Sequence, residues 1–122
     1  MKDDARSLGA WGEGKAAAYL RRRGYRIVAR NYRCRGGEID VIARKGGVLA
    51  FVEVKLRKNG DFGEAKEFVT AQKQRRVVVA ARHYLSLGGE ALQPRFDVVE
   101  VYAPNGTRTL FPRIIHLEDA FS

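Results

Sequence analysis

The sequence predicts an α/β domain, with a mixed β-sheet flanked by helices and the element order αβββαββ. The first observation is a pair of apolar runs on either side of Gly46-Gly47, a pattern typical of a β-hairpin. The second is a helical pattern on each side of that hairpin, over residues 4–23 and 70–87. The third is another strand pattern after the second helix, because a helix between two strands is the usual parallel crossover.

Length and composition predict one domain over residues 1–122, since 122 residues with 45% hydrophobic content suffice for a core. The net charge of +9 favours a polyanionic partner, nucleic acid first, while an anionic membrane surface stays an alternative. No apolar stretch approaches the roughly 20 residues of a membrane span, and the first residues lack the apolar run of a signal peptide. Cys34 alone cannot form an internal disulfide. We therefore expect a cytoplasmic protein.

The first helix, residues 4–23, is expected to end at Gly24. Glu13 falls on its small-residue stripe by the i, i+3, i+4 rule. Gly9 and Gly12 are expected to let the helix approach the sheet closely. From the pattern alone, Glu13 is interpreted as a capped surface acid.

A first strand is predicted over residues 25–34, where arginines alternate with Tyr25 and Tyr32. Arg33 and Arg35 are candidate phosphate contacts, because basic and aromatic residues mixed in this way suit a nucleic-acid surface. A plain half-exposed strand has the same pattern. Gly36-Gly37 then turns the chain into the central hairpin.

The central hairpin places charges where its pattern predicts burial. In its second strand, residues 48, 50, 52, 54 and 56 form an apolar face, while the other face carries Leu49 and Phe51 and then Glu53 and Lys55. In its first strand, Asp40 points away from Ile39, Val41 and Ala43, together with Glu38 and Ile42. Buried carboxylates are costly unless paired or metal-bound, and two of them can share Mg²⁺. The alternative is a cross-strand ion pair.

After Arg57, a polar loop over residues 58–66 leads to the second helix, which Thr70 is expected to cap. Lys73 and Gln74 fall at the amino-terminal end of this helix, near the carboxyl end of the strand that carries Lys55, and are candidate phosphate contacts. A strand is predicted over residues 95–102, a short edge strand over 107–111 and a packing tail over 114–121. His83 and His116 are interpreted as structural, and Ser86 lacks the context of a hydrolase nucleophile.

Gly37-Glu38-Ile39-Asp40 followed by Phe51-Val52-Glu53-Val54-Lys55 resembles the YraN-like family of small bacterial proteins. The resemblance extends over nearly the whole chain, including Gly12-Glu13, Lys73-Gln74 and 95–99. That family is similar to restriction-endonuclease-like nucleases and archaeal Holliday-junction resolvases, whose signature is an acid followed, after a gap, by Asp/Glu-x-Lys. Glu38 departs from the pattern, because a second acid there leaves the ligand assignment open between it and Asp40.

The resemblance implies a restriction-endonuclease-like core and a metal-dependent endonuclease that hydrolyses phosphodiester bonds in DNA, with branched or structured DNA among the candidate substrates. Asp40 and Glu53 would hold Mg²⁺ or Mn²⁺, Lys55 would act on water or phosphate, and Glu13 would complete the acidic cluster. The predicted nucleic-acid contacts are Arg33, Arg35, Arg57, Lys73 and Gln74.

Three alternatives stay open at this point: a non-catalytic nucleic-acid-binding module on the same fold, an RNA nuclease, and a membrane or protein-interaction factor. A homodimer is one option for the assembly, with Phe111 and Phe121 assigned to the core or to an interface equally well.

Overall fold

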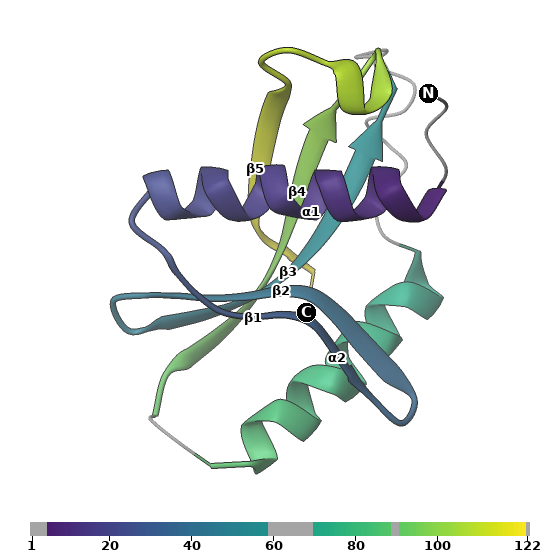
Figure 1. The fold of residues 1–122 in the computed structure, drawn as a ribbon. Coiled ribbons are helices and arrows are strands. Elements are labelled where there is room, and N and C mark those ends of the chain that lie inside the picture. Colours follow the sequence, from purple (N-terminus) through teal and green to yellow (C-terminus); the bar gives the residue numbers. More distant parts are fainter. Residues whose placement is uncertain (1–4, 59–69, 89–90, 122) are drawn as a thin grey trace.

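The computed structural model describes residues 5–58, 70–88 and 91–121. Its sheet has five strands in the order β1-β2-β3-β4-β5, and only β3 and β4 run parallel to each other. Helix α1 packs on one face and α2 on the other (Figure 1). The elements are α1 Ala5–Arg22, β1 Arg26–Cys34, β2 Gly37–Lys45, β3 Val48–Arg57, α2 Ala71–Ser86, β4 Gln93–Tyr102, a 3₁₀ turn η2 at Gly106–Arg108, and β5 Arg113–Phe121.

The predicted α/β class and mixed sheet are confirmed, but the fifth strand was placed wrongly. Residues 107–111 contain the end of η2 and irregular backbone, whereas the expected packing tail is strand β5, antiparallel to β4. Phe121 in this strand stacks on Phe96 of β4 with 5.2 Å between ring centroids, so it belongs to the core. The loop predicted over 58–66 lies outside the described residues except for Lys58.

Helix termini and strand faces follow the local signals. The side chain of Thr70 accepts a hydrogen bond from the Lys73 amide at 3.1 Å, which confirms the predicted N-cap of α2. In β3, Val52, Val54 and Leu56 pack with the cluster under α1, whereas Leu49 and Phe51 pack with the cluster under α2. The predicted alternation of β3 is therefore confirmed.

Strand β2 breaks the predicted alternation at Asp40. Ile39 packs on the α2 side together with Ile42, whereas Val41 packs on the α1 side. The ladder between β2 and β3 reaches only Val41 and Val52. Beyond that pair the strands separate, and Figure 1 shows β2 curving with β1 toward α2. The carboxylate of Asp40 accepts the backbone N–H of Val54 at 2.8 Å, so a side chain takes over where the ladder stops.

Two glycines permit close contact between helices and sheet. A Cβ on Gly12 of α1 would lie 2.8 Å from a methyl carbon of Leu56, and a Cβ on Gly37 of β2 would lie 2.3 Å from the carbonyl oxygen of Arg76 in α2. The expectation for Gly12 therefore holds. The same expectation for Gly9 is wrong, because a Cβ there would meet nothing within 4 Å.

Replacement of Gly37 by alanine should displace α2 from β2. The obstacle is the helix backbone, which cannot rotate aside as a side chain can. We expect Gly37→Ala to lower the free energy of unfolding by about 1–3 kcal/mol, measured by urea denaturation. Gly47→Ala is the matched control, since a Cβ at Gly47 would have no neighbour within 4 Å. Equal stability of the two variants would contradict the close packing of α2 on Gly37.

Candidate active site

Asp40 lies at the point where β2 leaves β3, between a glutamate from each side. Its carboxylate is close enough to raise the pKa of both Glu13, on α1, and Glu53, on β3. The prediction that these three acids come together agrees with this arrangement. Glu53 faces α2, while Glu13 approaches from α1 on the opposite face of the sheet, so Asp40 lies between acids from two faces.

Glu53 is the most deeply buried of the three acids, with 6% of its surface exposed. Burial, followed by the neighbouring charge of Asp40, raises the pKa of Glu53 to about 8, while Lys73 acts in the opposite direction. Its Oε1 is buried and has no hydrogen-bond partner among the described residues. A carboxylate held in this way needs either a proton or a cation.

Glu13 reaches the same region from α1. Burial raises the pKa of Glu13, and Asp40 adds to the effect, while the side chains of Asn31, Arg30 and Arg33 lower it. In the part of the chain that the structure covers, its Oε1 is likewise buried without a hydrogen-bond partner. Asn31 has a left-handed backbone conformation, with φ +52°, at the bend of β1, a conformation that asparagine tolerates better than most residues.

Glu38 is held by α2 and is less available than Asp40. Arg76 donates a hydrogen bond to its Oε1 at 2.9 Å, and the amine of Lys73 lies 3.3 Å from its Oε2. The hydrogen bond from Arg76 is the main cause that lowers the pKa of Glu38. The ambiguity between the two acids of β2 therefore favours Asp40 as the partner of Glu53.

Lys73 lies in the first turn of α2 near β3, where it was expected, and its amine faces two carboxylates. Its amine lies 3.3 Å from Glu38 and 3.7 Å from Glu53, so it neutralises part of the acidic cluster. Neither this pairing nor the contact of Arg76 with Glu38 was predicted from the sequence. The signal was present, because Arg76 lies three residues after Lys73 and so projects from the same side of α2.

Lys55 and Arg57 follow Glu53 at alternate positions of β3. The unbroken register with β4 puts all three on the same side of the strand. Lys55 is half-buried, and no ion pair is found for it within the described residues. Arg57 is buried and donates to Glu100 at 3.2 and 3.0 Å. Arg57 is therefore held by Glu100 inside the sheet and is not part of an exposed basic surface.

Arg33, on the edge strand β1, and Arg35, in the turn that follows it, are both exposed. Arg26 and Arg30 are exposed on β1 as well, so the open edge carries a row of guanidinium groups, of which Arg30 and Arg33 lie close enough to Glu13 to lower its pKa. Gln74 is half-buried in the first turn of α2. The structure thus places the arginines of β1 on an accessible edge, unlike Arg57.

The acidic cluster has buried carboxylate oxygens that could bind a cation, but among the described residues it does not gather three metal-ligand side chains. Two buried carboxylate oxygens, Oε1 of Glu13 and Oε1 of Glu53, lack partners over the described ranges, and a hard cation prefers such ligands. No three His, Cys, Asp or Glu side chains of the described residues are grouped closely enough to form a complete metal site. Because Mg²⁺ keeps several waters and uses one or two carboxylates, Asp40 and Glu53 fit its requirements.

The raised pKa of Glu53 predicts a stability that depends on pH. The folded protein binds a proton that the unfolded chain releases above about pH 4.5, so stability should fall as pH rises from about 4.5 to 8. Glu53→Gln removes this ionisation. Without metal, we expect it to be more stable than wild type at pH 8 by on the order of 2–4 kcal/mol, with little difference at pH 4.5.

Urea denaturation at both pH values measures this difference. Glu118→Gln is the control, because Glu118 is an exposed acid on β5. A constant difference between Glu53→Gln and wild type over this pH range would contradict the burial of a carboxylate at Glu53.

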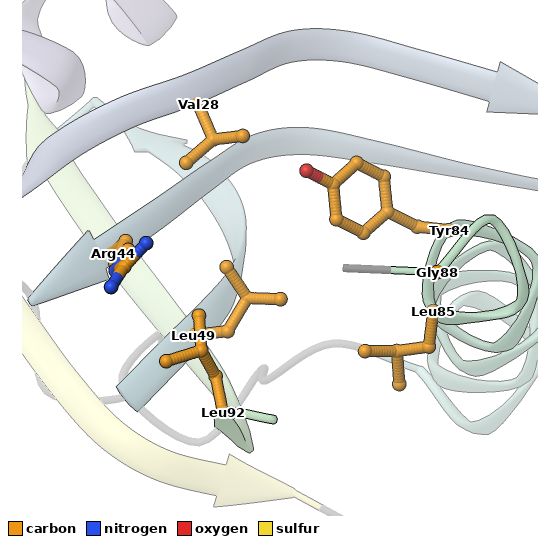
Figure 2. Close-up of a pocket in the computed structure, with 7 residues that line it drawn as sticks. All are labelled: Val28, Arg44, Leu49, Tyr84, Leu85, Gly88 and Leu92. Atoms are coloured by element: carbon orange, nitrogen blue, oxygen red, sulfur yellow. The ribbon is translucent and has the colours of Figure 1, made fainter. Parts of the chain in front are cut away.

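A separate hollow of about 300 Å³ lies at the other end of α2. Figure 2 shows Val28, Leu49, Tyr84, Leu85 and Leu92 around it. Lys73 and Leu85 are 12 residues apart, which corresponds to roughly 18 Å along the helix. The described residues that line the hollow include no acid, so it is distinct from the acidic cluster.

None of the helices in the described part of the chain is long and apolar enough to cross a membrane.

The family model of the uncharacterised protein family UPF0102 matches residues 12–101. A UPF0102 protein of Symbiobacterium thermophilum is 55% identical over 98 residues, 80% of this chain and 83% of the relative. One from Chlorobium phaeobacteroides is 48% identical over 102 residues, 83% and 80% of the two chains. One from Geobacter sulfurreducens is 45% identical over 117 residues, 93% and 88%. The chain belongs to the UPF0102 family.

Proposed function

We propose that this protein is a metal-dependent endonuclease that hydrolyses phosphodiester bonds in DNA, on a restriction-endonuclease-like core. The observation that supports this most is the meeting of Glu13, Asp40 and Glu53 where β2 separates from β3, with two buried carboxylate oxygens that lack partners within the described residues. Lys55 follows on the same side of β3. A purely structural cluster would be expected to satisfy these oxygens.

Each side chain has a distinct task in this proposal. Asp40 and Glu53 hold Mg²⁺ or Mn²⁺, which when bound supplies an activated water and neutralises charge on the phosphate. Asp40 also keeps its hydrogen bond with the Val54 amide, which fixes the carboxylate in place. Glu13 completes the acidic cluster from its outer side. Lys55 holds the phosphate or the attacking water, because a fixed cation there stabilises developing negative charge.

The edge strand β1 supplies the DNA-binding surface in this proposal. Arg30 and Arg33 lie close enough to Glu13 to lower its pKa, and Arg35 continues the exposed row. Backbone phosphates along this row would pass the acidic cluster. Such contacts release counterions, so the affinity for DNA should fall by about 0.9 log unit per log unit of salt for each phosphate neutralised.

The test uses Asp40→Asn, because an asparagine oxygen can still accept the Val54 N–H while the negative charge is lost. We expect wild type to bind Mn²⁺ and to cut linear, flapped or four-way-junction DNA, and Asp40→Asn to do neither while it folds normally. Calorimetric titration with Mn²⁺ and a cleavage assay measure the two properties. Glu118→Asn is the control for loss of an acid elsewhere. Cleavage that persists in Asp40→Asn would overturn the assignment of the site.

A non-catalytic nucleic-acid-binding module is the second candidate, and one observation favours it. The amine of Lys73 already lies between Glu38 and Glu53, so a cation of the protein itself neutralises part of the cluster. In that case wild type would bind DNA with the same salt dependence but would neither bind Mn²⁺ nor cut. The metal titration therefore separates the two candidates without relying on activity.

A further inference from the structure

The loop between β4 and β5 exposes two large apolar side chains that the site described above does not use. Leu110 is 81% exposed and Phe111 is 95% exposed, the highest values among the exposed large hydrophobic residues described. The loop lies beyond the end of β4 (Figure 1). We call Leu110 and Phe111 the apolar wedge.

The loop is fixed by its own hydrogen bonds. The hydroxyl of Thr109 accepts the amide of Asn105 at 2.9 Å, and the amide of Thr109 donates to the carbonyl of Gly106 at 3.0 Å. Thr109 itself is buried, directly before the apolar wedge. Phe111 has φ +54°, a left-handed conformation that is unusual for an aromatic residue. The hydrogen bonds of Thr109 therefore hold the loop in a conformation in which the wedge is exposed to solvent.

Two hollows include the wedge in their lining, and the charged residues among those that line them are all basic. One hollow of about 300 Å³ includes Arg113, and the other, of about 500 Å³, includes Lys15 and Arg22 of α1. Among the described residues that line either hollow, none is acidic. An aromatic side chain between basic residues is typical of surfaces on which nucleic-acid bases stack.

The charges argue against a second copy of the chain as the occupant. A two-fold contact through the wedge would bring the same patch of each copy together, and so would place Lys15, Arg22 and Arg113 of one copy opposite the same basic patch of the other. Like charges opposed at an interface cost several kcal/mol. A polyanion with apolar faces fits both the wedge and its rim.

We propose that the apolar wedge stacks against an unpaired or unstacked base of the DNA, with Lys15, Arg22 and Arg113 close to the adjoining phosphates. This inference rests on the proposed function insofar as DNA is the ligand. Glu13 and Lys15 are two residues apart on α1, about 200° around the helix axis. The wedge therefore contacts the DNA across α1 from the acidic cluster, and it gives the protein a preference for DNA that contains unpaired bases.

The experiment measures equilibrium binding in EDTA, without the divalent cation that the proposed cleavage requires. The ligands are forked DNA that carries 2-aminopurine at an unpaired position and a fully paired duplex of the same length. We expect Phe111→Ala to bind the fork roughly 5- to 150-fold more weakly than wild type, the range for loss of one stacked base. It should also lose the change in 2-aminopurine fluorescence. Phe111→Trp should restore both. Leu87→Ala, at an exposed leucine on the far end of α2, is the matched control.

Unchanged affinity and fluorescence in Phe111→Ala would overturn the wedge while leaving the nuclease proposal in place. Conversely, fork binding that depends on Phe111 in a protein that does not cut would support the wedge and contradict the nuclease. A shift from dimer to monomer in Phe111→Ala, with DNA affinity unchanged, would overturn the wedge in favour of self-association. If Phe111→Ala lost as much affinity for the paired duplex as for the fork, the proposed preference for unpaired bases would also be overturned.

Discussion

Lys55→Ala should lower the cleavage rate by about 10²–10³-fold while folding and metal binding stay intact, as when one preorganised donor is removed from an active site. Lys55 shares the side of β3 that carries Glu53, and it has no ion-pair partner among the residues that the structure describes. A lysine that served only in a surface ion pair would contribute about 0–1 kcal/mol to stability and nothing to activity. The cleavage assay compares wild type and Lys55→Ala on linear, flapped and four-way-junction DNA.

Lys58→Ala is the matched control, because Lys58 is exposed just after the same strand. It removes the same charge, so a general loss of DNA attraction would affect both variants equally. A similar decrease for Lys55→Ala and Lys58→Ala would mean that Lys55 contributes only charge. Weaker Mn²⁺ binding in Lys55→Ala would show that it acts on the acidic cluster and not on the phosphate or water.

The largest loss of stability is expected at Asp97, a fully buried carboxylate on β4. Arg95 donates two hydrogen bonds to it at 2.8 and 2.7 Å, the ring of His116 lies at 2.8 Å, and the amide of Asp119 donates at 3.0 Å. Arg95 also donates to the hydroxyl of Tyr25, which links β4 to the chain segment after α1. Asp97 therefore joins three parts of the chain on the α1 side of the sheet.

We expect Asp97→Ala to lower the free energy of unfolding by about 3–5 kcal/mol, because it leaves the buried partners of the carboxylate without an acceptor. Burial alone would raise the pKa of Asp97, but the hydrogen bonds from His116, Arg95 and the Asp119 amide lower it to about 2. The negative charge of Asp97 therefore contributes about 2 kcal/mol to the free energy of unfolding above pH 4. This contribution is lost as the pH falls toward 2. Urea denaturation at pH 7 and at pH 2 measures both effects.

Asp119→Asn is the control for this variant. Asp119 is exposed and has φ +52°, a conformation that asparagine also tolerates, so its amide should keep donating to Asp97. Asp119→Asn should change the free energy of unfolding little at either pH. If Asp97→Ala lost no more stability than Asp119→Asn, the network around Asp97 would not support the junction of β4 and β5.

Local signals in the sequence determined the elements whose causes are local. The alternation of β3, the cap at Thr70 and the end of α1 before Gly24 each depend on residues within a few positions of one another. The proximity of Asp40 to Glu53 was predicted from the hairpin between them, although the ladder of β2 and β3 ends one residue before this pair, at Val41 and Val52. Strand parity likewise placed Lys55 on the side of β3 that carries Glu53.

The tertiary structure alone decided features that depend on distant residues. Strand β5 was not predicted because it pairs with β4 around an irregularity at Asp97, and its own alternation is interrupted by Glu118 and Asp119. Arg57 was expected on the surface, yet Glu100, 43 residues away, holds it inside the sheet.

The same is true of the cations around the candidate site. Lys73 was expected to contact phosphate, and its amine lies beside Glu38 of β2 and Glu53 of β3. Where β2 carries Glu38, α2 packs closely on the backbone of Gly37, a contact between residues about 40 positions apart in the chain. The sequence alone therefore determined which residues carry charge into the sheet, whereas the packing of α2 on the sheet decided which of those charges neutralise one another.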